Sequence, residues 1–139
     1  MDATRLIAIR HGETEWNVNT RIQGQLDIGL NATGVWHARR AGGALADEPI
    51  GVVYASDLSR AWQTAEEIAR PHGLAVQPEP RLRERACGTF EGMSFAEIEA
   101  TLPEQARRWP MSRSRPSMQA TCRAPGRPRR PSAPCAAWQ

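Results

Sequence analysis

An arginine and a histidine stand side by side at Arg10 and His11, after the apolar run 6–9 and before Gly12. A short apolar run that ends at a glycine is typical of a buried strand with an abrupt end, and an α/β sheet presents its chemistry at such ends. An imidazole can act as a nucleophile, and a guanidinium binds phosphoryl oxygens through paired hydrogen bonds. The arrangement therefore indicates phosphate chemistry.

Two further motifs accompany this pair along the chain. Residues 56–65 read Ser-Asp-Leu-Ser-Arg-Ala-Trp-Gln-Thr-Ala, and residues 82–84 read Leu-Arg-Glu. Together with the octet Arg-His-Gly-Glu-Thr-Glu-Trp-Asn at 10–17, these motifs resemble the histidine phosphatase superfamily, also called phosphoglycerate mutase-like. The resemblance covers about residues 4 to 109. It implies a three-layer α/β/α fold and catalysis through a phosphohistidine.

The resemblance gives four residues a catalytic role. It makes His11 the nucleophile, and it makes Glu84 the residue that protonates the leaving oxygen and then activates water. Arg10 and Arg60 match the positions that hold the phosphoryl oxygens. The alternative interpretation is a core or surface histidine for His11 and a solvated surface charge for Arg60 and Glu84. Three further residues match substrate-contacting positions, with an ordinary turn or surface role as the alternative: Asn17, Gln23 and Gly24.

The family also carries a second catalytic histidine, in a late strand followed by His-Gly, whereas this sequence has no histidine after His72. The resemblance therefore implies a truncated chain with an incomplete sheet, which lacks the late strand beside the first one. Each buried backbone group left unpaired costs about 1–3 kcal/mol, and a folded domain is stable by only about 5–15 kcal/mol. Whether such a chain folds and turns over is therefore left open.

The stretch 88–98 looks more like the phosphatase branch of the family than the phosphoglycerate mutases. We expect a phosphomonoester hydrolase that acts on a phosphorylated small molecule without a cofactor. A phosphoglycerate mutase of the same superfamily and a non-catalytic phosphate-binding pseudoenzyme are the alternatives. The sequence identifies neither the substrate nor the oligomeric state.

Alternating strand and helix signals predict an α/β domain over residues 1–110. Apolar runs predict strands at 6–10, 51–55 and 74–78. Pro78 places the last of these near a sheet edge, because proline lacks a donor for the ladder.

Capping residues predict where the helices begin. Asn31 caps one helix, and Asp57 caps another that has Arg60 in its first turn. Ser94 and Glu97 have the spacing of a capping box, which opens a third helix. The inward faces of the first two helices are predicted from apolar spacing: Val35, Ala38, Gly42 and Leu45, then Leu58, Ala61, Ala65 and Ile68. The third helix carries three apolar residues on one face: Phe95, Ile98 and Leu102.

The charge changes sharply after Pro110. Residues 1–110 hold 12 arginines and 15 acidic residues, a net charge of −3, whereas residues 111–139 hold 6 arginines and no acidic residue. The second segment has five prolines and no Val, Ile, Leu or Phe, a composition that predicts a disordered tail. We favour a frameshifted or misread C-terminus; a solvated basic tail and a tether to nucleic acid or acidic membrane are the alternatives.

The three cysteines, Cys87, Cys122 and Cys135, have the spacing of neither a disulfide framework nor a zinc site, so we expect no metal. No apolar run approaches the roughly 20 residues that span a bilayer. Residues 1–5 do not read as a signal peptide. We therefore expect a cytoplasmic chain without a membrane or nucleic-acid partner.

Overall fold

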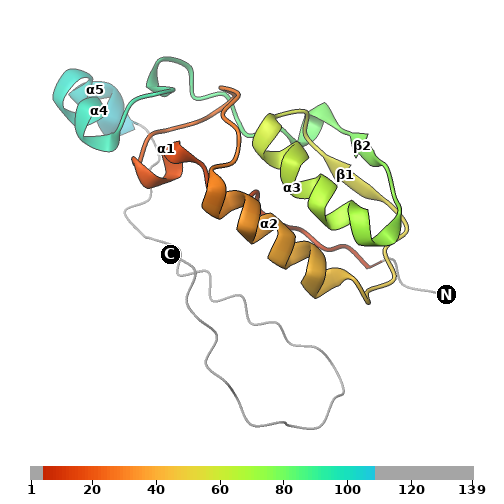
Figure 1. Ribbon diagram of the computed structural model, residues 1–139. Helices are drawn as coiled ribbons and strands as arrows, with labels where there is room; N and C mark the ends of the chain where they lie inside the picture. The colour runs from red at the N-terminus through yellow and green to blue at the C-terminus, as the bar shows by residue number, and fades with distance from the viewer. Residues whose placement is uncertain (1–4, 109–139) are drawn as a thin grey trace, which may run out of the picture. The chain divides into compact units, whose positions relative to one another are not determined.

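The computed structural model of this chain describes residues 5–108. The helices, short 3₁₀ turns (η) and strands of this range are, in order (Figure 1), α1 (Glu15–Val18), α2 (Ala32–Leu45), β1 (Val53–Ala55), α3 (Ser59–Ala69), η1 (Arg70–His72), β2 (Val76–Pro78), η2 (Pro80–Leu82), η3 (Gly88–Phe90), α4 (Phe95–Thr101) and α5 (Pro103–Arg108). None of the described helices is both long and apolar enough to cross a membrane. The predicted tail at 111–139 lies outside the described residues, so the division at residue 110 stays a prediction.

The strands β1 and β2 pair in parallel, with Val53 opposite Val76 and Ala55 opposite Pro78. Parallel neighbours need a crossover connection, and α3 supplies it, packing against both strands (Figure 1). Within residues 5–108, β2 pairs with β1 alone, so both strands are edges there and the edge position predicted from Pro78 stays a prediction. The predicted α/β class is thus confirmed. The strands β1 and β2 are shorter than the apolar runs at 51–55 and 74–78 from which they were predicted.

Small residues let α2 and α3 pack closely side by side (Figure 1). Ala38 and Gly42 of α2 are buried, as are Ala65 and Ile68 of α3. A methyl group at Gly42 would lie 2.2 Å from the carbonyl oxygen of Glu67. The two helices therefore meet at a backbone contact, on the faces that the sequence predicted.

The predicted caps at Asn31 and Ser94 are confirmed. The Asn31 side chain accepts a hydrogen bond from Gly34 N (2.7 Å) and so caps α2. Ser94 and Glu97 form the capping box of α4. Gly73 has a φ of +63° directly after η1, a left-handed conformation that glycine adopts without strain.

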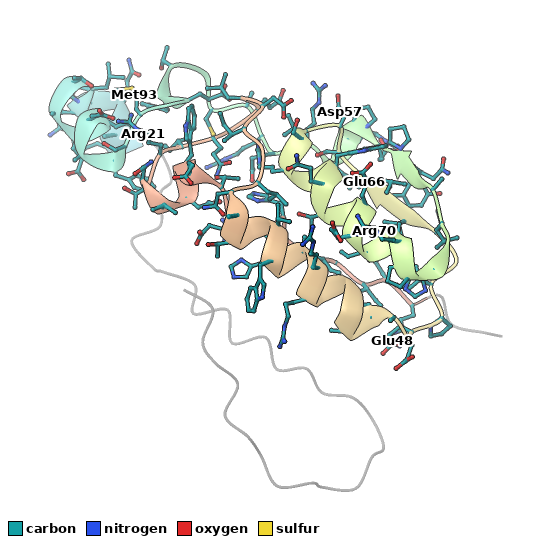
Figure 2. All side chains as sticks on the ribbon, viewed as in Figure 1. Arg21, Glu48, Asp57, Glu66, Arg70 and Met93 are labelled. Atoms are coloured by element: carbon teal, nitrogen blue, oxygen red, sulfur yellow. The ribbon has the colours of Figure 1, made fainter. Side chains whose placement is uncertain are left out.

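An apolar cluster forms where two segments that are distant in sequence pair. Ile22 N donates to the Met93 carbonyl oxygen (2.9 Å), and Gly92 N donates to the Ile22 carbonyl oxygen (2.8 Å). Arg21 and Met93 mark this region in Figure 2. Three buried residues form the centre of the cluster: Cys87, Phe90 and Ile98.

Two predictions about buried apolar residues are wrong. Residues 6–10 form no strand, and Leu6 is 90% exposed. A strand needs a hydrogen-bonded neighbour, and no described segment pairs with this run. Phe95 is 46% exposed instead of facing inward. Ile22 and Met93, brought in by the pairing of distant segments, pack against the apolar cluster instead.

Candidate active site

His11 is half-buried, and its Nδ1 lies 2.7 Å from the carbonyl oxygen of Gly12. A carbonyl oxygen only accepts hydrogen bonds, so the neutral ring carries its proton on Nδ1. Nε2 then keeps a free lone pair. This is the tautomer that a nucleophilic imidazole requires.

Close backbone contacts fix the loop that carries His11. Gly12 N donates to Thr64 Oγ1 of α3 (3.0 Å), and Thr64 is 5% exposed. A methyl group at Gly12 would lie 2.4 Å from the Gly34 carbonyl oxygen, and one at Gly34 would lie 2.0 Å from the Glu13 carbonyl oxygen. The start of α2 thus touches the His11 loop backbone to backbone, while α3 holds it through Thr64.

The N-terminus of α3 is capped by a residue from a distant loop. Asp27 accepts hydrogen bonds from Ser59 N (2.6 Å) and Ser59 Oγ (2.8 Å). The predicted cap, Asp57, is wrong: its carboxylate accepts instead from Arg83 Nε (2.6 Å), and a guanidinium is a stronger partner for it than a backbone N–H. Since α3 nevertheless begins at Ser59, Arg60 lies in its first turn as predicted.

Arg60 is 2% exposed, although it carries a guanidinium. It donates to the carbonyl oxygens of Leu26 (2.9 Å) and Gly24 (2.8 Å). Burial lowers the pKa of Arg60, and nearby carboxylates, with Glu84 foremost, oppose that shift. A guanidinium has five N–H donors, so Arg60 can hold this loop and still offer donors to an anion.

Glu84 is positioned through its backbone. Gln25 Nε2 donates to the Glu84 carbonyl oxygen (3.0 Å). The preceding residue, Arg83, binds Asp57, which Figure 2 shows near the start of α3, and this guanidinium holds the pKa of Asp57 below its ordinary value. The Glu84 side chain itself is exposed, and its Oε1 accepts from Arg85 N (3.0 Å). Its carboxyl group can therefore meet a ligand from solvent.

Burial and nearby charges set the pKa of His11. Burial lowers the pKa of His11 below its ordinary 6.5, and the positive charges of Arg60 and Arg10 lower it further. The hydrogen bond to Gly12 and the charge of Glu84 act in the opposite direction. The charges of Arg10, Arg60 and Glu84 therefore all act on His11, and their balance with burial favours the neutral imidazole.

The three predicted substrate contacts have different surroundings. Asn17 Oδ1 accepts from Thr14 N and Thr14 Oγ1 (3.0 Å each), which closes the first turn of α1. Gly24 has a φ of +52°, and its carbonyl oxygen accepts a hydrogen bond from Arg60. Gln23 is 9% exposed, and its Oε1 has no hydrogen-bond partner within the described residues. Of the three, Gln23 is the one with a buried acceptor still available.

Sequence reasoning missed four residues that support the site. Thr64, inside the second motif, holds the His11 loop. Asp27 caps α3, and Gln25 and Glu91 connect the loop at 24–26 to the segment around Glu84. Thr64 and Glu91 lie inside the stretches 56–65 and 88–98 that carry the family resemblance, and this is the signal that could have found them. The partners of the others lie tens of residues away in sequence, where no local pattern reports them.

Within residues 5–108, no three His, Cys, Asp or Glu side chains gather in a way that could hold a metal ion. A surface hollow of about 470 Å³ lies against α3 and β2, with Trp62, Glu66 and Arg70 in its lining. Figure 2 labels Glu66, which lies on α3, and Arg70, which begins η1 directly after it. None of the predicted catalytic residues lines this hollow.

The sequence profile of the histidine phosphatase superfamily (branch 1) matches residues 6–124. The chain belongs to the histidine phosphatase superfamily. The match runs past Trp109, beyond the range 4 to 109 over which the motifs indicate the resemblance.

Curated histidine phosphatase relatives carry both phosphatase and mutase names. The chain is 38% identical over 109 residues to the glucosyl-3-phosphoglycerate phosphatase of Mycobacterium tuberculosis (strain H37Rv), covering 78% of this chain and 49% of that protein. It is 42% identical over 106 residues to phosphoglycerate mutase-like protein 4 of Arabidopsis thaliana, covering 75% and 46%. The chain thus spans about half the length of the curated relatives it matches.

Solved structures of histidine phosphatases share the fold. A mycobacterial glucosyl-3-phosphoglycerate phosphatase in complex with VO3 matches with a TM-score of 0.67 at 37% identity, over 71% of this chain and 47% of that one. The phosphoserine phosphatase of Entamoeba histolytica in complex with 3-phosphoglyceric acid matches with a TM-score of 0.61 at 34% identity, over 68% and 47%. The described residues therefore have the phosphoglycerate mutase-like α/β fold.

Proposed function

We propose that this chain is a phosphomonoester hydrolase that works through a phosphohistidine on His11. One observation carries the proposal. The Nδ1 of His11 donates to the Gly12 carbonyl oxygen and leaves Nε2 as the nucleophile, in a setting where burial and two arginines keep the ring neutral. An uncharged imidazole beside cationic groups is suited to attack an anionic phosphorus centre, because the cations attract the phosphate while the ring keeps its lone pair.

The reaction proceeds in two displacements at phosphorus. In the first, His11 Nε2 forms a bond to phosphorus, the ester P–O bond breaks, and Glu84 gives its proton to the departing alkoxide. In the second, water attacks the phosphohistidine, Glu84 takes the proton of that water, and phosphate leaves His11. Arg10 and the remaining donors of Arg60 hold the phosphoryl oxygens in both steps.

The substrate we propose is a phosphorylated small molecule. The names of the relatives refer to glucosyl-3-phosphoglycerate, phosphoglycerate and phosphoserine. Gln23 is the best supported of the three substrate contacts, because its buried Oε1 lacks a protein partner and can accept a substrate N–H or O–H. For Asn17 and Gly24, the hydrogen bonds to Thr14 and Arg60 favour a supporting role beside the substrate.

Phosphate release from a panel of these three esters tests the proposal, with His11→Asn as the matched variant. Asparagine keeps a polar side chain of similar size but has no ring nitrogen to phosphorylate. The proposal expects phosphate release by the full chain and none above background by the variant. Transfer of the phosphoryl group to a second hydroxyl of phosphoglycerate would instead indicate a mutase. Ester binding without release or adduct would indicate a pseudoenzyme.

A further inference from the structure

Glu91 joins two segments that carry candidate active-site residues. Its Oε1 accepts hydrogen bonds from Gln25 N and Cys87 N, each at 2.9 Å. A methyl group on Gly24 would lie 2.1 Å from the same oxygen, so the Gly24 backbone is in direct contact with the carboxylate. The carboxylate therefore fastens the loop at 24–26 to the segment that follows Glu84.

The loop at 24–26 is the shared support of two residues in the proposed reaction. From one side, Arg60 donates to the carbonyl oxygens of Gly24 and Leu26. In addition, Gln25 Nε2 donates to the Glu84 carbonyl oxygen (3.0 Å). A shift of Gln25 would thus move the Glu84 backbone, whereas the carbonyl groups that hold Arg60 belong to its neighbours Gly24 and Leu26.

We propose that Glu91 is a positioning residue, which holds Glu84 where its carboxyl group can protonate the leaving oxygen. This inference rests on the proposed function. A carboxylate suits the role because hydrogen bonds to an ionised acceptor are roughly twice as strong as neutral ones. The two backbone N–H groups lower the pKa of Glu91, and the charge of Arg60 adds to that effect, so the acceptor stays ionised near neutral pH.

Substrates with different leaving groups distinguish a positioning role of Glu91 from a general structural role. An alkyl ester such as phosphoserine needs a proton on its departing oxygen, whereas p-nitrophenyl phosphate releases a stable anion without one. The value of kcat/KM reports on steps up to the first phosphoryl transfer and is unaffected by the later release of phosphate. Misplacing Glu84 therefore lowers kcat/KM for phosphoserine and leaves that for p-nitrophenyl phosphate nearly unchanged.

The experiment compares Glu91→Gln, Gln25→Ala and Glu84→Gln in the full chain with both substrates. A positioned general acid contributes about 100-fold or more, so Glu84→Gln should lose at least that factor with phosphoserine. A misplacement near 1 Å costs up to about 100-fold, and we expect Glu91→Gln and Gln25→Ala to lose about 10-fold with phosphoserine and less than about 3-fold with p-nitrophenyl phosphate. The double variant of Glu84 and Glu91 should lose no more than Glu84→Gln alone.

Glu97→Gln is the matched control, because this carboxylate also accepts a backbone N–H, from Ser94, and it belongs to the capping box of α4. It should leave the ratio of the two kcat/KM values as in the unmodified chain. Equal losses with both substrates in Glu91→Gln would overturn the positioning role and leave the proposed function standing. An unmodified chain that forms no phosphohistidine with either ester would overturn both.

Discussion

Replacing Gly42 and its neighbour Gly43 separately by alanine tests the close approach of α2 and α3, on which the site depends. Both glycines lie in the last turn of α2, and alanine in place of glycine stabilises a helix by about 0.5–1 kcal/mol. A methyl at Gly43 would meet nothing within 4 Å, whereas one at Gly42 would lie 2.2 Å from the Glu67 carbonyl oxygen. The intrinsic helix preference is the same for both, so the difference between the variants isolates the contact.

The magnitude follows from the size of the overlap. Real Cβ atoms keep at least 3.0 Å from such atoms, so α2 and α3 must separate by several tenths of an ångström in Gly42→Ala. Overpacking of this kind costs about 1–3 kcal/mol. We therefore expect Gly43→Ala to be more stable than the unmodified chain by about 0.5–1 kcal/mol, and Gly42→Ala to be about 1–3 kcal/mol less stable than Gly43→Ala.

Urea unfolding of the full chain, followed by circular dichroism, measures both free energies of unfolding. The kinetic consequence is a lower kcat/KM in Gly42→Ala alone, since α2 contacts the His11 loop and α3 carries Arg60. A Gly42→Ala chain as stable as Gly43→Ala would refute the backbone contact between these helices.

Substitutions at two residues and one titration test individual interactions. Thr64→Val leaves the buried N–H of Gly12 without its partner and should lower the free energy of unfolding by about 1–3 kcal/mol. Thr64→Ser keeps the hydroxyl and should lose less. Equal losses in the two variants would contradict the role of the hydroxyl. Because the pKa of His11 is lowered from 6.5, its neutral form should persist below pH 6.5. An NMR titration of the His11 ring in the ligand-free chain measures this, and a midpoint at or above 6.5 would contradict the lowered pKa. Asp27→Ala removes both acceptors from Ser59 and should lower the free energy of unfolding in urea by about 0.5–2 kcal/mol. Asp27→Asn keeps one acceptor and should lose less. An alanine variant of unchanged stability would show that the cap is dispensable.

Local signals predicted the helices well, because their causes lie within a few residues. The caps at Asn31 and Ser94 are hydrogen bonds to N–H groups three residues away. The small residues of α2 and α3 repeat at helical spacing, which placed Gly42 on the contact face. That His11 and Arg60 act at one site followed from the family resemblance, not from local signals.

The sequence could not predict features whose partners are distant. Asp57 has the residue type of a helix cap, yet Asp27, 32 positions before Ser59, fills that role. The burial of Arg60 depends on two carbonyl groups more than 30 residues away. The apolar run at 6–10 has a strand pattern, but a pattern supplies no hydrogen-bonded neighbour.

The central claim is that His11 becomes phosphorylated. Brief incubation of the full chain with a labelled phosphate monoester, followed by a denaturing alkaline quench, preserves an acid-labile phosphohistidine, and peptide mapping locates it. The account predicts one labelled site at His11, lost in His11→Asn and weakened when Arg60→Met removes the guanidinium. Phosphate release without an adduct on His11, or a label on another residue, would contradict it.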